Sequence, residues 1–340
     1  MKKVIVYSII AGFTAMVCSC GQKNILPERK PLHVTEIIAE DLFTSFPGTL
    51  RVNSKHLLLH CPRGDGGEKF LMIYDRNSGE QITRVGGFGR GPGEWITPAL
   101  GNVIDDKLVV YDLNVRQYVL SSAEDMYQDI SNPNSIKKLE IDISNMIYID
   151  NHQYIVASWK EKRPFEMVSK NGLISCGKYP FEENITNTIE RFQGHILKHP
   201  QKKVMIYATI SNPYLAMYNI KDDSLELVWE NQFLSPDYTV YNQQLQWGNN
   251  QPNGISDIVF TKNYIVCLIK DFQSEARGMD IRNTPKAVYL FDYKGRLTHI
   301  FDLPYHTIRL AADALSNSFY TVSLEPDYSI VKYDLATVGL

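Results

Sequence analysis

The chain has 340 residues, of which 44% are hydrophobic, so it is long and apolar enough to bury a large core. Its 20 tyrosines and 14 phenylalanines favour strands over long helices. The formal net charge is −3. It becomes −5 if Lys2 and Lys3 are removed, because 33 basic residues then face 38 acidic ones. This balance argues against a nucleic-acid partner.

The first twenty residues have the pattern of an export leader. Lys2 and Lys3 precede an apolar run over residues 4–17, which is too short for a typical transmembrane helix, and small residues follow up to Cys20. The segment Val17-Cys18-Ser19-Cys20 resembles a bacterial lipobox. The resemblance implies cleavage before Cys20 and attachment of acyl chains such as palmitate. The alternative is an ordinary secretory leader that is cut nearby.

We therefore expect a lipoprotein signal peptide over 1–19, a tether over 20–32 and a folded domain over 33–340. Several acyl chains hold a protein on a membrane without a spanning helix, so the membrane is the first expected partner. Residues 21–26 lack the acidic cluster that often sends such lipoproteins to the cell exterior. This favours a lipid anchor in the outer membrane, on the periplasmic side rather than at the cell surface.

A hairpin pattern returns six times along the rest of the chain: a polar turn, an apolar run, a second loop, and an apolar run ending in Asp, Asn or Ser. The turns lie near Asn53, Asp106, Asn151, Gln201, Lys262 and Ser316, so 263 residues cover five steps of about 53 residues. The pattern predicts an all-β fold, a six-bladed β-propeller of four-stranded antiparallel blades. The alternative for short strands separated by turns is one β-sandwich or two.

Five units supply four strands each and the sixth supplies three. In chain order the expected strands cover 49–53, 56–61, 70–75, 80–85; 100–104, 107–112, 116–120, 136–141; 146–149, 154–158, 165–169, 173–177; 196–198, 204–209, 214–219, 225–229; 255–260, 264–269, 287–292, 297–301; and 307–311, 319–323, 329–334. An unassigned strand at 33–39 matches the missing one. We expect it to complete the last blade beside 329–334, because closure by an N-terminal strand removes both exposed edges of the ring.

Three cysteines remain beyond the lipobox, namely Cys61, Cys176 and Cys267. Export permits disulfides, but the number is odd and the three lie in the first, third and fifth units. We expect all three to be buried strand residues.

The densest motif is the glycine-rich run over residues 86–95. A phosphate-binding loop would need a helix after it, and the residues that follow form a poor helix. The run, the strand that ends at Asp112 and the turn Asn114-Val115-Arg116 together resemble an NHL repeat. With the lipobox, the chain is similar to the TolB-like, NHL-repeat-like six-bladed propeller lipoproteins of Gram-negative anaerobes. The resemblance implies no assigned chemistry, and it implies that Arg116 braces its blade against Asp112.

Binding residues are expected in the connections between blades and in the loops between the second and third strands of a blade. In an antiparallel blade both kinds of connection emerge at the same edge, and binding usually takes place on such loops. Aromatic rings and charged groups suit a polar ligand such as a glycan or peptide, or another envelope protein. The candidate ligand-binding residues are Arg90, Trp95, Trp159, Arg163, Tyr241, Trp247, Arg277 and Arg282.

Catalytic motifs are not visible, so we expect a binding protein rather than an enzyme. The eight histidines show no metal-binding spacing, and no Gly-x-Ser-x-Gly elbow occurs. One alternative is a calcium-dependent hydrolase of the lactonase type, in which Asp257 would hold calcium in the channel with Asn102, Asn145 and Ser256. A second alternative is a structural partner in an envelope complex, which would expose an apolar patch.

Overall fold

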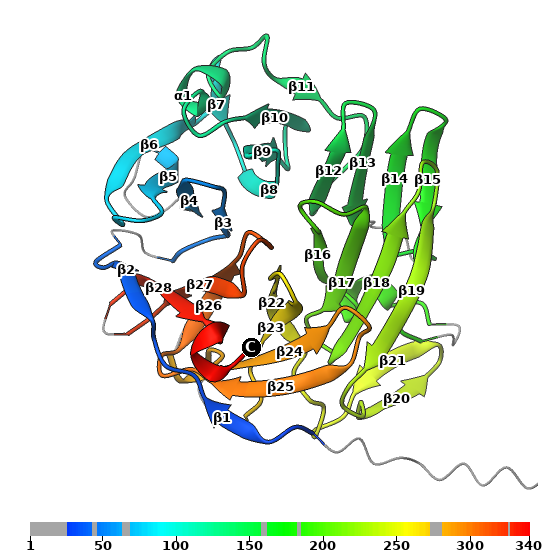
Figure 1. The fold of residues 1–340 in the computed structure, drawn as a ribbon. Coiled ribbons are helices and arrows are strands. Elements are labelled where there is room, and N and C mark those ends of the chain that lie inside the picture. Colours follow the sequence, from blue (N-terminus) through cyan, green and yellow to red (C-terminus); the bar gives the residue numbers. More distant parts are fainter. Residues whose placement is uncertain are drawn as a thin grey trace, which may run out of the picture.

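The computed structural model describes residues 26–42, 46–62, 69–157, 162–181, 185–272, 281–325 and 327–340. These residues form six blades around a central channel, as Figure 1 shows, so the all-β six-bladed propeller expected from the sequence is confirmed. The blades are mainly four-stranded and antiparallel. Within the described ranges, no helix combines the length and the apolar character needed to cross a membrane.

The first three blades follow the chain order, each from the channel outward. Blade 1 contains β3 (Leu50–Val52), β4 (His56–His60), β5 (Lys69–Asp75), β6 (Gln81–Phe88) and the short β7 (Glu94–Trp95). Blade 2 contains β8 (Pro98–Ile104), β9 (Lys107–Asp112), β10 (Gln117–Ser121) and β11 (Lys137–Lys138), with helix α1 (Met126–Asp129) before β11. Blade 3 contains β12 (Met146–Asp150), β13 (Gln153–Ala157), β14 (Phe165–Ser169) and β15 (Gly172–Cys176).

The last three blades are built in the same way. Helix α2 (Thr188–Arg191) leads into blade 4, which contains β16 (Gly194–Lys198), β17 (Val204–Thr209), β18 (Tyr214–Ile220) and β19 (Leu225–Gln232). The separate hairpin of β20 (Tyr238–Tyr241) and β21 (Gln244–Trp247) precedes blade 5, which contains β22 (Ile255–Phe260), β23 (Tyr264–Ile269), β24 (Ala287–Asp292) and β25 (Leu297–Asp302), with η1 (Ile281–Asn283) before β24. Blade 6 contains β26 (Thr307–Ala311), β27 (Ser318–Ser323) and β28 (Ser329–Asp334), and η2 (Leu335–Val338) follows.

The N-terminal segment closes the ring as expected. Strand β2 (Glu36–Ala39) pairs antiparallel with β28 as the outermost strand of blade 6. The sequence did not indicate a second contact: β1 (Arg29–Pro31) pairs in parallel with β25 of blade 5. Residues 29–31 of the expected tether therefore belong to the fold, and the N-terminal segment joins two blades.

Other differences from the expected strands have local causes. The outer strand of blade 2 was expected over 136–141 but covers only Lys137–Lys138, because the connection before it folds into α1 and packs inward. Met126 and Ile130 of that connection are fully buried together with Trp95. Trp95 in turn belongs to β7, where the glycine-rich run folds back to pair with β6.

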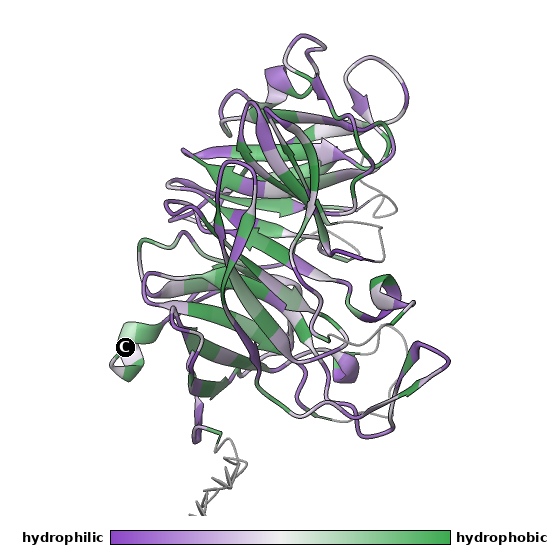
Figure 2. Ribbon diagram, turned by 90° about the vertical axis from the view of Figure 1, so that its right-hand side faces the viewer, coloured by the Kyte–Doolittle hydropathy of each residue, from purple (hydrophilic) through white to green (hydrophobic). Residues whose placement is uncertain are grey.

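The core is divided among the junctions between neighbouring blades. Each of six buried apolar clusters joins one adjacent pair of blades, and together the six pairs complete the circle. Middle strands such as β27 are buried along their whole length because blades cover both of their faces. Figure 2 shows hydrophobic residues concentrated in the strands and hydrophilic ones in many of the turns. Cys61, Cys176 and Cys267 are buried, as expected, and free; Cys176 lies in β15 and Cys267 in β23, whereas Cys61 directly follows β4 and is not a strand residue.

The NHL-like motif is structural, with one correction. The Asp112 carboxylate is fully buried and accepts hydrogen bonds from four backbone N–H groups, those of Ile96, Thr97, Asn114 and Val115. Arg116 does not pair with Asp112, because those backbone groups occupy both carboxylate oxygens. Its Nη2 instead contacts Asp142 Oδ1 at 2.6 Å.

A substitution at Gly79 tests how closely the closing strand β2 packs against blade 1. Its φ is +72°, and a Cβ added there would lie 1.5 Å from the Ile38 carbonyl oxygen in β2. Gly79→Ala should therefore lower the free energy of unfolding by more than the ~1–2 kcal/mol of a left-handed backbone alone. Gly172→Ala is the matched control, because Gly172 has φ +110° with no atom within 4 Å of the added Cβ. Urea unfolding measures both variants, and equal losses would contradict this position of β2.

Candidate functional site

The central channel contains a cavity of about 280 Å³ to which all six blades contribute. Four of its lining residues carry ionisable side chains near the axis: Arg51 in β3, His195 in β16, Asp257 in β22 and Arg309 in β26. The remaining lining residues are Thr49, Ala99, Leu100, Tyr111, Ser144, Asn145, Ile196, Leu197 and Ile258. Ionisable groups therefore lie inside the ring, at the innermost strands.

Polar side chains of the inner strands connect one blade to the next. Arg51 Nε donates to the Gly101 carbonyl of blade 2 at 2.7 Å, and Arg309 Nε donates to the Gly48 carbonyl of blade 1 at 2.8 Å. Asp257 Oδ2 accepts from the Leu310 N–H of blade 6 at 2.8 Å. Asn102 in blade 2 both donates to the Tyr148 carbonyl and accepts from its N–H in blade 3. These bonds explain why polar residues stand at positions that face the axis.

The two arginines place their guanidinium groups at partly buried positions inside the ring. Burial lowers the pKa of Arg51; Asp257 opposes this effect and Arg309 adds to it. Burial also lowers the pKa of Arg309, again opposed by Asp257. Among the described residues, neither arginine has a carboxylate oxygen within 4.0 Å.

The surroundings of His195 disfavour a positive charge on its imidazole. Burial lowers the pKa of its imidazole below the ordinary 6.5; Asp257 opposes the shift, while Arg309 and Arg51 add to it. A hydrogen bond to the Ser256 backbone also opposes the shift. The His195 Nε2 atom is buried and has no partner within the described part of the chain.

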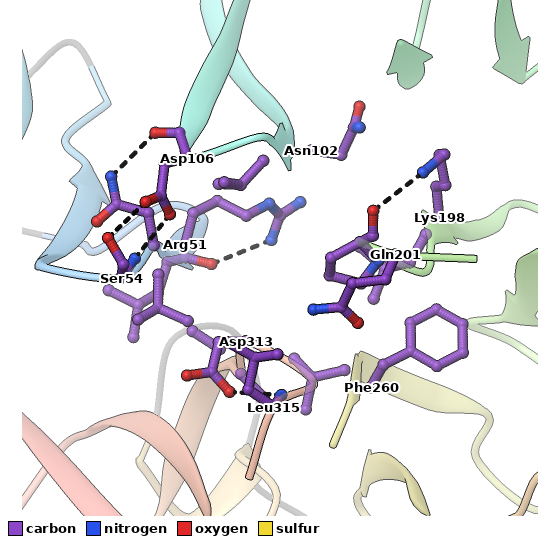
Figure 3. Close-up of a pocket in the computed structure, with 18 of the residues that line it drawn as sticks. Arg51, Ser54, Asn102, Asp106, Lys198, Gln201, Phe260, Asp313 and Leu315 are labelled. Atoms are coloured by element: carbon purple, nitrogen blue, oxygen red, sulfur yellow. Dashed lines mark hydrogen bonds between the residues drawn. The ribbon is translucent and has the colours of Figure 1, made fainter. Parts of the chain in front are cut away.

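A second cavity, of about 320 Å³, opens at one end of the channel (Figure 3). We call it the mouth cavity, and we call that side of the disc the turn face, because there the first strand of each blade turns into the second. Five blades contribute inner-strand ends and turns, all except blade 3. Arg51 and Leu197 line both cavities, so the mouth cavity and the channel cavity are neighbours.

Some polar groups of the mouth cavity already form hydrogen bonds or ion pairs with other protein groups. Asp106 accepts from the Ser54 backbone and hydroxyl, which lowers the pKa of its carboxyl group. Asp313 pairs with Arg76 at 2.6 Å. The Lys198 ammonium donates to the carbonyls of His199 and Pro200, and burial lowers its pKa. Figure 3 shows Asp106 and Ser54 across the cavity from Lys198, Gln201 and Phe260.

The opposite side of the disc, which we call the loop face, carries the connections between blades. A third cavity of about 280 Å³ lies there between blades 3 and 4, beside the connection that contains α2. The β20–β21 hairpin is attached to this connection, because Asn187 exchanges two hydrogen bonds with the Leu245 backbone. An aromatic cluster of Phe181, Phe192, Tyr238 and Trp247 fills the space between them.

The sequence-predicted ligand residues do not converge on one cavity. Strand order assigns the segments of Arg90, Arg163, Tyr241, Trp247 and Arg282 to the loop face, yet none of the five lines the mouth cavity or the channel cavity. Tyr241 is 70% exposed at the tip of its hairpin, whereas Trp247 belongs to the aromatic cluster. Trp159 and Arg277 lie outside the described residues.

Trp95 stabilises the core instead of facing a ligand. Its side chain is fully buried, and the indole Nε1 donates to the Ile130 carbonyl at 3.1 Å. Its expected position at the surface is therefore wrong, because the glycine-rich run turns back into blade 1 and carries the indole between blades 1 and 2.

The residues considered for calcium do not form a ligand set. Both oxygens of Asp257 accept backbone N–H groups, and the Asn102 amide is engaged with Tyr148. Asn102 lines the mouth cavity, whereas Asp257 and Asn145 line the channel cavity. The described ranges contain no group of three or more His, Cys, Asp or Glu side chains that could hold a metal.

Arg51, His195 and Arg309 were not among the residues predicted from the sequence. The usable signal was a charged residue between apolar neighbours in a first strand, as in Leu50-Arg51-Val52 and Ile308-Arg309-Leu310. In a strand buried on one side, such a residue must face the channel, because side chains alternate between the two faces. Comparing the first strands of all units would have placed the two arginines and Asp257 together.

Comparisons with known proteins agree with the fold. A family model described as TolB-like 6-blade propeller-like matches residues 27–313. A Bacteroides fragilis protein assigned as exported is 11% identical, with a TM-score of 0.56, over 89% of this chain and 94% of that one. A member of the DUF4221 family from Bacteroides vulgatus is 10% identical, with a TM-score of 0.55, and the match covers 89% of this chain and 96% of that one. No sequence among curated proteins matches the chain.

His199, beside the mouth cavity, should make stability fall in acid. Its Nδ1 accepts two backbone N–H groups, and burial, with Lys202 and Lys198 nearby, lowers the pKa of its imidazole to about 4. In the unfolded chain this imidazole takes up a proton near pH ~6.5, whereas in the folded chain it does so only near pH 4. The free energy of unfolding should therefore fall by on the order of 3 kcal/mol as the pH falls between these two values. His199→Asn keeps an acceptor without this titration. Urea unfolding at pH 7 and 4.5 should show a flatter pH dependence in the variant; identical slopes would contradict the buried neutral histidine.

Proposed function

Because the chain belongs to the TolB-like family of six-bladed propellers, we propose that it is a binding protein without catalytic activity, anchored to a membrane by lipid. Its ligand would be a small polar molecule or a short segment of a larger one, such as a glycan or a peptide. The binding position would be the mouth cavity on the turn face.

The observation that carries the proposal is the mixed lining of the mouth cavity. Asp105 and Gln201 are exposed turn residues whose side chains make no hydrogen bond within the described residues. Phe260 and Leu315 supply apolar surface beside them. Ligand pockets commonly combine such an apolar wall with a few polar groups, at volumes of about 300–1,000 Å³. The cavity has this composition, and its size of about 320 Å³ is at the lower end of that range.

The loop face is the competing position, and it is where the sequence favours a ligand. Its support is the aromatic cluster around Trp247 together with the exposed Tyr241 and the basic Arg163. Aromatic rings beside charged groups suit a glycan or a peptide. A partner protein is the third option, and it would need an exposed apolar patch. The exposed large apolar side chains Ile82, Leu173 and Leu227 belong to three different blades.

Glycan and peptide arrays compare the two faces directly. We expect Gln201→Ala and Asp105→Asn to weaken binding about tenfold or more, which corresponds to ~1.4 kcal/mol. Tyr241→Ala and Arg163→Ala should leave it unchanged. Ile82→Ser, on the outer strand β6, is the control for a surface change remote from both faces. Loss of signal in the loop-face variants alone would move the site to that face.

Anchoring through Cys20 is part of the proposal, although Cys20 lies outside the described residues. The lipobox-like segment supports it, and so does the structural similarity to a Bacteroides protein assigned as exported. The expected location is the outer membrane, on the periplasmic side.

Cys20→Ser should abolish lipid attachment and release a soluble protein, because no other segment is expected to hold the chain on a bilayer. Labelling with a fatty acid analogue, followed by separation of membrane and soluble fractions, measures both effects. Cys18→Ser is the matched control and should keep the label. Label that persists on the Cys20 variant would refute this acceptor.

A further inference from the structure

The channel cavity contains more positive charge than the fold needs. We propose that it is a binding site for the oxyanion group of a small ligand, a carboxylate or a phosphate, held between Arg51 and Arg309. This site is distinct from the mouth cavity and would exist even if the mouth cavity bound nothing.

The hydrogen bonds that Arg51 and Arg309 make to backbone carbonyls use only some of their N–H donors. Arg51 donates from Nε to Gly101 and from Nη1 to Leu50, and Arg309 donates from Nε to Gly48 and from Nη1 to Ile308. In the described residues, the Nη2 group of each arginine donates to no protein acceptor. A guanidinium carries five N–H donors in a planar fork that matches carboxylate and phosphate oxygens. Each arginine therefore keeps donors for a ligand while its other donors fix its position.

The charges that line the cavity do not balance. Arg309 lies close enough to Arg51 to disfavour the positive charge of Arg51, and Asp257 is the only carboxylate among the described lining residues. Asp257 lies within electrostatic range of both arginines but contacts neither within 4.0 Å, because its oxygens accept the Ile258 and Leu310 N–H groups. Both guanidinium groups are partly buried and, among the described residues, have no carboxylate within 4.0 Å, so one bound anion would lower the free energy of the folded protein.

The surroundings fit a ligand that carries an oxyanion. Neutral polar groups, those of Thr49, Ser144 and Asn145, also line the cavity and can hydrogen-bond the rest of a small molecule. The unpartnered Nε2 atom of His195 adds a further polar contact from the opposite part of the ring. The channel cavity adjoins the mouth cavity, with which it shares Arg51 and Leu197, and also the loop-face cavity, with which it shares Ser144, Asn145, His195 and Ile196.

Titration calorimetry of the mature chain carrying Cys20→Ser tests the proposal, with inorganic phosphate and acetate as probes at low ionic strength. We expect saturable binding of at least one of them, with a Kd below about 1 mM. Arg51→Met and Arg309→Met should each weaken it about tenfold or more. Arg116→Met is the matched control, because Arg116 is half exposed and pairs with Asp142 away from the channel. The stronger probe identifies the class of oxyanion.

Two measurements remain decisive if the arginine variants fail to fold. Asp257→Asn removes the negative charge from the cavity and should tighten binding several-fold. Crystals of the unmodified sequence soaked in selenate should show anomalous density between Arg51 and Arg309. Absence of saturable binding to the chain that carries Cys20→Ser alone, or selenate found only elsewhere, would overturn the proposal. Unchanged binding in both folded arginine variants would also overturn it.

Discussion

The fold depends on a constraint at its axis, where six inner strands meet without forming a common backbone ladder. Each inner strand pairs with its own blade on one side, so its other edge presents backbone groups that still need partners. Polar side chains supply them: Asn102 bonds the Tyr148 backbone, Asp257 accepts from Leu310, and Arg51 and Arg309 donate to the next blade. Further out, the apolar clusters at each blade junction and the N-terminal strands hold the same ring together.

The polar side chains that join the inner strands also determine the charge inside the channel. Arg51 and Arg309 reach carbonyls of the next blade, and they bring two positive charges that Asp257 balances only in part. The structural need for donors therefore creates an electropositive cavity at the centre of the propeller. Arg51 lines both the mouth cavity and the channel cavity, so a residue that joins two blades also lies at both proposed binding positions.

The strand pattern was predictable from the sequence because apolar runs alternate with polar turns at a regular interval. The closing strand β2 was also predictable, since the sixth unit lacked one strand. The parallel pairing of β1 and the inward turn of Trp95 were not, because both depend on tertiary contacts that no local pattern encodes. The functional positions were harder still: loop composition favoured the loop face, whereas the mouth cavity arises from turns of five blades and the channel cavity from inner strands of all six.

Amide hydrogen exchange at Tyr148 and Leu310 tests most directly whether inner-strand side chains join the blades. Both N–H groups point away from their own blade's ladder and are bonded by Asn102 and Asp257 respectively. We expect both amides to be protected in the wild type. Asn102→Ala should speed exchange at Tyr148 alone, and Asp257→Ala should do so at Leu310 alone, by about tenfold or more for a lost bond of ~1.4 kcal/mol. Exchange at these amides that is already fast in the wild type, or that the substitutions leave unchanged, would contradict the side-chain connection between blades.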